Sequence, residues 1–99
     1  MNQINVFLSS QDPNVDPQEF DVEIAGDDGT KTTHRVQVAK ETHQRLTGGL
    51  KSPEELVRTS FEFLLEREPK ESILKSFDLG KIQGYFPEYE IVISAQLAK

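Results

Sequence analysis

Two groups of residues in the chain have side chains suited to metal binding or acid–base chemistry. In the first group, Asp12, Asn14, Asp16 and Glu23 occupy ligand positions of a calcium-loop spacing, and their oxygens are ligands that Ca²⁺ prefers. The position where such a loop needs glycine for its sharp turn is Pro17, whose ring restricts the backbone. We therefore predict no metal site in this segment.

The second group is the two histidines, His34 and His43. A zinc site or a nucleophilic mechanism needs further ligands, or a nucleophile and a carboxylate, converging on a histidine. The sequence contains no such spacing, no cysteine, no glycine-rich phosphate loop and no serine elbow. We predict that the protein is not an enzyme, has no catalytic residues, and uses no cofactor and no small-molecule substrate.

The composition is that of a small globular protein. With 99 residues, of which 35% are hydrophobic, the chain suffices for one modest core. No apolar run approaches the roughly 18 residues needed to span a bilayer, and no basic-then-apolar signal begins the chain. We expect no membrane partner and a cytoplasmic location.

The net charge of −6 is unevenly distributed. Residues 1–30 hold seven acidic residues and no Lys or Arg, whereas residues 31–60 hold six basic and three acidic residues. Because the first segment is acidic and the middle segment is net basic, only the middle segment has a charge suited to binding a polyanionic partner.

The elements expected at the N-terminal end are an arm and a hairpin. Residues 1–18 are predicted to be a flexible acidic arm, because "SSQDPNVDPQ" combines two prolines with turn-forming residues. Residues 19–99 are predicted to be a single α+β domain. It begins with two alternating strands, "FDVEIA" (20–25) and "THRVQVA" (33–39), joined by an Asp-Gly turn into an antiparallel hairpin.

Helical patterns follow the hairpin. A short helix over 40–46 is stopped by Gly48-Gly49, and "SPEE" then forms a capping box in which Ser52 begins a helix running to about Glu68. Pro69 ends that helix and starts another, and the β-branched run "YEIVISAQL" (89–97) predicts a final strand. The expected fold is α+β, with a small antiparallel sheet, made of the N-terminal hairpin and the C-terminal strand, packed on two to three helices.

The segment "THRVQVAKETHQRLTGGLKSPEELVRTSFEFLLER", residues 33–67, resembles the ribbon-helix-helix (Arc-like) family of dimeric DNA-binding regulators. It shares a short alternating strand, an immediate polar helix, a glycine-containing turn and a Ser-capped second helix. The resemblance implies that strands of two chains pair into a ribbon that enters the major groove. It also implies that Thr33, Arg35 and Gln37 read bases and that the helix start at Ser52 faces a backbone phosphate.

Two classes of function fit these features of the sequence. One is a non-catalytic interaction module in which an exposed strand edge or helix face pairs with a second copy or with another protein. The alternative is a DNA-binding transcriptional regulator that resembles ribbon-helix-helix proteins. The two differ in whether strand 33–39 pairs inside the chain or across a dimer axis, since the predicted hairpin already occupies one of its edges.

Overall fold

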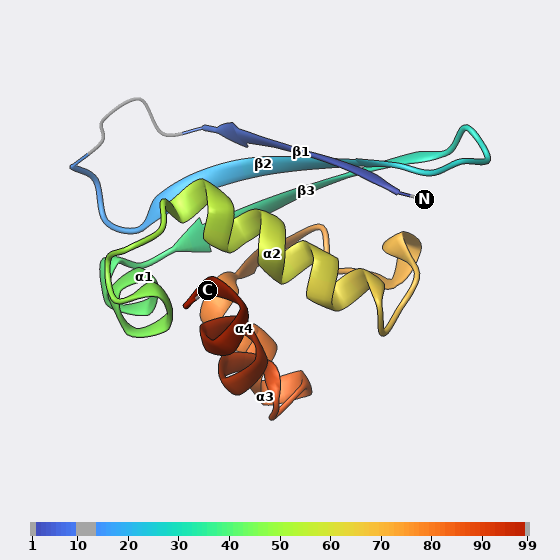
Figure 1. Cartoon of the computed structure of the whole chain (residues 1–99). Helices are drawn as coiled ribbons and strands as arrows, with labels where there is room; N and C mark the ends of the chain where they lie inside the picture. The colour runs from blue at the N-terminus through green and yellow to red at the C-terminus, as the bar shows by residue number, and fades with distance from the viewer. Residues whose placement is uncertain (1, 10–13, 99) are drawn as a thin grey trace.

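The computed structural model of the chain describes residues 2–9 and 14–98. It has an α+β fold, as predicted, in which the helices lie on one face of a four-stranded sheet (Figure 1). The strands follow one another across the sheet in the order β1-β2-β3-β4. They are β1 (Gln3–Leu8), β2 (Gln18–Ala25), β3 (Lys31–Val38) and β4 (Ser76–Asp78).

The predicted hairpin is confirmed by the antiparallel pairing of β2 and β3. Its turn includes Gly29 with φ 84°, a conformation that glycine adopts without strain, and Asp28 Oδ1 accepts a hydrogen bond from the Thr30 N–H. Alternation along the strands buries Phe20, Val22 and Ile24 against the helices. The neighbouring side chains point to the open face of the sheet.

The predicted flexible arm is wrong for residues 3–8, which form β1 and pair antiparallel with β2. Ile4 and Val6 lie opposite Ile24 and Val22, so the same two-residue alternation that made β2 recognisable as a strand also operates in "QINVFL". Further along the segment, Asp16 Oδ1 accepts a hydrogen bond from the Lys40 N–H at 3.0 Å. Residues 10–13 lie outside the described residues.

The two helices predicted after the hairpin are present as α1 (Lys40–Thr47) and α2 (Pro53–Leu65). Gly48 ends α1 in the left-handed conformation, with φ 64°. Ser52 caps α2, because its Oγ accepts a hydrogen bond from the Glu55 N–H at 3.1 Å. The buried face of α2 includes Leu56, Val57 and Phe61, as the spacing predicts.

The chain after α2 differs from the helix predicted to start at Pro69. One 3₁₀ turn, η1 (Lys70–Ser72), leads into the short strand β4, which pairs in parallel with β3, so the sheet is not purely antiparallel. Ile73 and Phe77 are buried as a helix would bury them, but Phe77 reaches the core as the strand neighbour of Val36. A second 3₁₀ turn, η2 (Leu79–Lys81), and α3 (Ile82–Tyr85) follow.

The predicted C-terminal strand over 89–97 is wrong, because these residues form α4 (Tyr89–Leu97). Tyr89, Ile93 and Leu97 are buried at four-residue spacing, whereas Ile91 is 76% exposed. Burial of that helical face outweighs the weak strand preference of β-branched residues. The Tyr89 hydroxyl lies 2.7 Å from Ser60 Oγ, and burial raises the pKa of this phenol.

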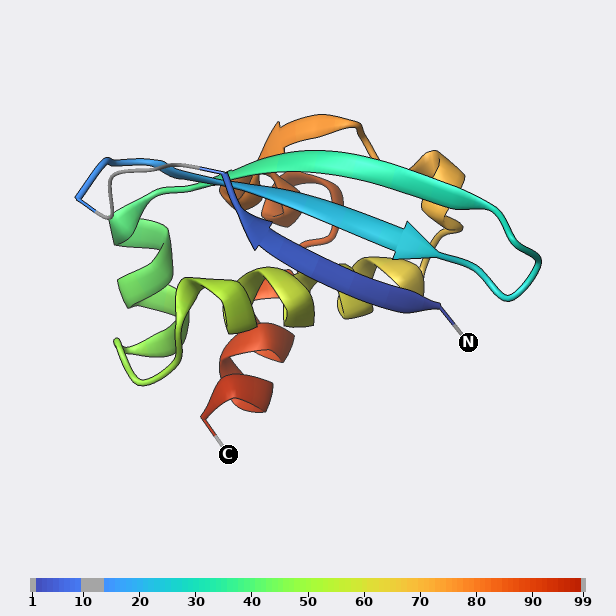
Figure 2. The ribbon, with the colours of Figure 1, turned by 90° about the horizontal axis from the view of Figure 1, so that it is seen from above.

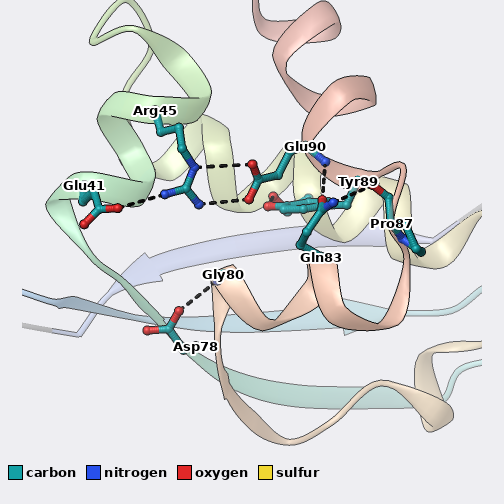
Figure 3. Close-up of polar contacts among 9 residues, drawn as sticks. Glu41, Arg45, Asp78, Gly80, Gln83, Pro87, Tyr89 and Glu90 are labelled. Carbon is teal, nitrogen blue, oxygen red and sulfur yellow. Dashed lines mark hydrogen bonds and ion pairs between the residues drawn. The ribbon is translucent and has the colours of Figure 1, made fainter.

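Polar contacts tie α4 to its neighbours (Figure 3). Arg45 on α1 binds Glu90, with Nη2 and Oε2 2.9 Å apart. Gln83 on α3 accepts a hydrogen bond from the Glu90 N–H and donates one to the Pro87 carbonyl. No helix within residues 2–9 and 14–98 is long and apolar enough to cross a membrane.

Candidate interaction surfaces

The predicted base readers Thr33, Arg35 and Gln37 lie side by side on the open face of the sheet, because the residues between them point to the core. Arg35 Nε donates a hydrogen bond to Asp21 Oδ1 at 3.0 Å, and its Nη1 lies 3.8 Å from Glu19 Oε1. Gln37 Nε2 donates to Glu19 Oε2 at 3.2 Å. Two of the three readers are therefore engaged by carboxylates of β2.

The electrostatics of the open face follow from these pairs. Lys31, the other base on β3, lies 3.6 Å from Glu23 on β2. The hydrogen bond with Asp21, together with the nearby carboxylates, raises the pKa of the Arg35 guanidinium above its ordinary value. Each base on β2 and β3 thus has an acidic neighbour, so these two strands present no surplus of positive charge to a phosphate backbone.

The edges of β3 are also occupied where a ribbon would form. Residues 35–37 have β2 on one side and β4 on the other. The intermolecular strand pairing of the ribbon-helix-helix family requires a free edge at this place. Ser52 lies at the start of α2 in the helical layer, across the sheet from the readers (Figure 1). The structure therefore brings Thr33, Arg35 and Gln37 together and leaves Ser52 apart from them.

Both histidines have hydrogen-bonding partners in the backbone. His34 is buried, with Nδ1 2.8 Å from the Leu74 carbonyl oxygen and Nε2 2.9 Å from Thr32 Oγ1. His43 Nε2 lies 2.6 Å from the Lys51 carbonyl oxygen. Among the residues that the structure describes, no group of three or more His, Cys, Asp or Glu side chains is placed to hold a metal ion.

The outer strand β1 is the first surface that sequence reasoning missed. It forms one edge of the sheet, and β4 forms the opposite edge (Figure 2). Phe7 is 56% exposed on the open face and Leu8 is 45% exposed at the end of the strand. Residues 1–11 contain no charged side chain. Edge strands in soluble proteins usually carry charges or prolines that prevent pairing with other chains, and β1 carries neither.

The hydrogen-bonding pattern of β1 shows which of its backbone groups face away from β2. The Ser9 N–H donates to the Glu19 carbonyl, so the odd-numbered residues of β1 bond to β2 and the even-numbered residues face outward. Accordingly, the outward Ile4 carbonyl accepts a hydrogen bond from Arg58 Nη1 at 2.6 Å. The N–H and C=O groups of Val6 and Leu8 face outward at the same edge.

A groove beneath the β4 side of the sheet is the second surface. Its cavity volume is about 180 Å³. The walls come from the end of α2, the η1–β4 segment and α3; they include Leu64, Ile73, Phe77, Ile82 and Phe86. No pattern in the sequence indicates this groove, because the helix predicted after Pro69 would place these residues differently.

Within residues 2–9 and 14–98, the fold is a compact α+β fold with a hydrophobic core, an uncharged outer strand and a groove lined by apolar side chains. No protein-family model, curated protein or solved structure matches the chain.

Proposed function

We propose that this chain is a cytoplasmic, non-catalytic interaction module that self-associates by pairing the β1 strands of two copies. The single observation that carries the proposal is the outer strand β1, whose own side chains are uncharged and which displays Phe7 and Leu8. Addition of a strand to an exposed edge is a common mode of protein recognition, because main-chain hydrogen bonds supply affinity and side chains supply specificity.

The outward-facing backbone groups of β1 favour one register for pairing with a second copy. In this register, β1 pairs antiparallel with β1 of a second copy through the outward groups of Val6 and Leu8. Val6 of each copy then lies opposite Leu8 of the other. The two Phe7 residues then face each other at the two-fold axis as a non-hydrogen-bonded pair, the closest kind of cross-strand pair. The Ile4 carbonyl stays outside this pairing, which fits its hydrogen bond with Arg58.

A second copy is a suitable partner because this edge meets itself without charge repulsion. The nearest acid on the open face is Asp21, which lies opposite Phe7 on β2 and is paired with Arg35. Across two β1 strands, the two Asp21 side chains would be three strand spacings apart, about 14 Å. That separation exceeds the screening length of about 8 Å at physiological salt.

A single cysteine tests the register, since the chain has none of its own. Phe7→Cys should form a disulfide-linked dimer on mild oxidation, because Cα atoms of a non-hydrogen-bonded pair are about 4.5 Å apart, within disulfide range. Asn5→Cys is the matched control, since position 5 also faces the open side of β1 but lies away from the proposed axis. Non-reducing gels and light scattering provide the readout.

Two results would count against the proposal. A wild-type protein that stays monomeric at high concentration, together with a Phe7→Cys protein that does not cross-link, overturns self-association through β1. If Asn5→Cys cross-links and Phe7→Cys does not, β1 is still the interface but the proposed register is wrong.

A further inference from the structure

The groove at the β4 side has the size of one bulky apolar side chain. Its volume of about 180 Å³ compares with the roughly 150 Å³ of an apolar cavity that binds benzene. The side chains of Ile73, Phe77 and Ile82 in its lining are themselves buried or nearly so. An aromatic or large aliphatic group entering the groove would therefore contact apolar side chains on several sides.

The rim of the groove combines apolar and charged residues. Leu74 is 52% exposed and Tyr85 is 68% exposed, although both are large and apolar. Glu68 and Lys81 also line the groove, and neither forms an ion pair within the part of the chain that the structure describes. An apolar hollow beside exposed apolar residues and free charges is the usual composition of a site for a partner's anchor residue.

The walls of the groove are held in place before any partner arrives. The Asp78 side chain accepts a hydrogen bond from the Gly80 N–H at 2.8 Å, which fixes the turn that follows β4 (Figure 3). Gln83 on α3 bonds both to Pro87 and to the backbone of α4. A site that is ordered in advance loses less conformational entropy on binding.

We propose that this groove docks a peptide segment of another protein that carries one bulky apolar anchor. The anchor occupies the hollow, with a basic residue of the peptide toward Glu68 and an acidic residue toward Lys81. Because β1 and β4 lie at opposite edges of the sheet (Figure 2), pairing through β1 would leave both grooves of a dimer open. The binding of two peptides by one dimer rests on the proposed function, whereas the binding of one peptide in the groove does not.

Selection from a library of short random peptides displayed on phage tests the proposal with the full chain. Wild-type protein should enrich peptides with a Phe, Trp or Leu between a basic and an acidic residue. Ser72→Trp, a change at an exposed rim position, should fill the groove and weaken binding of the selected peptide about tenfold or more. Circular dichroism verifies that this variant is folded.

Charge variants provide a second readout that does not depend on filling the groove. Glu68→Lys should weaken the selected peptide several-fold and favour one whose basic residue is replaced by an acid. Glu62→Lys is the matched control, because Glu62 is an exposed residue of α2 outside the groove. Chemical shifts of the Ile73 and Ile82 amides should move on titration with the selected peptide.

Three results would overturn the proposal. One is a selection with no enrichment, and another is equal binding of the peptide to wild type, Ser72→Trp and Glu68→Lys. The third is a shift of the groove amides with the protein's own concentration that Leu50→Ser abolishes, because the occupant is then the exposed Leu50 of a second copy. None of these results depends on β1, so failure here is distinct from failure of self-association.

Discussion

Strands β1 and β3 differ in how far their neighbours in the sheet leave them accessible to a partner. β3 carries the residue types that suggest recognition, but Arg35 is held by Asp21 and Glu19, and residues 35–37 have a strand on each side. β1 carries no charged residue, yet it has a neighbour on one side only within the described chain. Availability for a partner follows from an open edge and exposed apolar area rather than from reactive side chains.

The largest expected effect separates the two strands by their role in the fold. Val36→Pro should destabilise the protein by about 3 kcal/mol or more, because Val36 is fully buried in an inner strand and proline removes a backbone donor there. Urea denaturation followed by circular dichroism measures the change. A variant as stable as wild type would contradict the inner position of β3.

A proline in the outer strand should act differently. Val6→Pro removes an N–H that faces away from β2, so the free energy of unfolding should change by less than about 1 kcal/mol. Self-association should weaken about 100-fold or more, because the same N–H is used in the proposed pairing. Analytical ultracentrifugation measures the dissociation constant, and urea denaturation measures stability.

Phe7→Lys provides an independent route to the same result. It keeps the backbone donor and places like charges at the proposed axis, and the side chain it replaces is 56% exposed. Loss of dimer in both variants with the fold intact supports β1 as the interface. Unchanged association in both would assign any dimer to another surface.

The sequence predicted the elements in which local signals agree with tertiary contacts. The Asp-Gly hairpin, the Gly48 stop and the Ser52 cap are read from neighbouring residues, and all three are present. The C-terminal strand was wrong because the β-branched run "IVI" is placed in a helix by contacts with distant residues, such as Tyr89 with Ser60. A four-residue spacing of Tyr89, Ile93 and Leu97 was the available signal.

The candidate surfaces were less predictable than the fold. The alternation of Ile4, Val6 and Leu8 was visible in the sequence, but the prolines that follow favoured an arm over a strand. Whether an alternating strand lies at the edge or inside a sheet depends on long-range pairing, which a two-residue period does not contain. The groove depends on the arrangement of three separate segments, so no local sequence pattern predicts it.

The smallest expected effect concerns the open face of the sheet and the DNA-reading role that the ribbon-helix-helix resemblance implies for it. Arg35→Ala should leave self-association unchanged, because Arg35 lies on β3, and should change stability less than either proline variant, because exposed ion pairs contribute little. Duplex DNA binding, measured by fluorescence anisotropy at low salt, should be undetectable for wild type and variant alike, since carboxylates already pair with the Lys and Arg side chains of this face. A wild-type signal that falls steeply with salt and disappears in Arg35→Ala would instead make β3 a DNA-reading strand, because phosphate contacts release counterions and a lost base contact removes sequence preference. That result would require Arg35 to exchange Asp21 for a base, and Asp21→Asn should then strengthen binding by freeing the guanidinium.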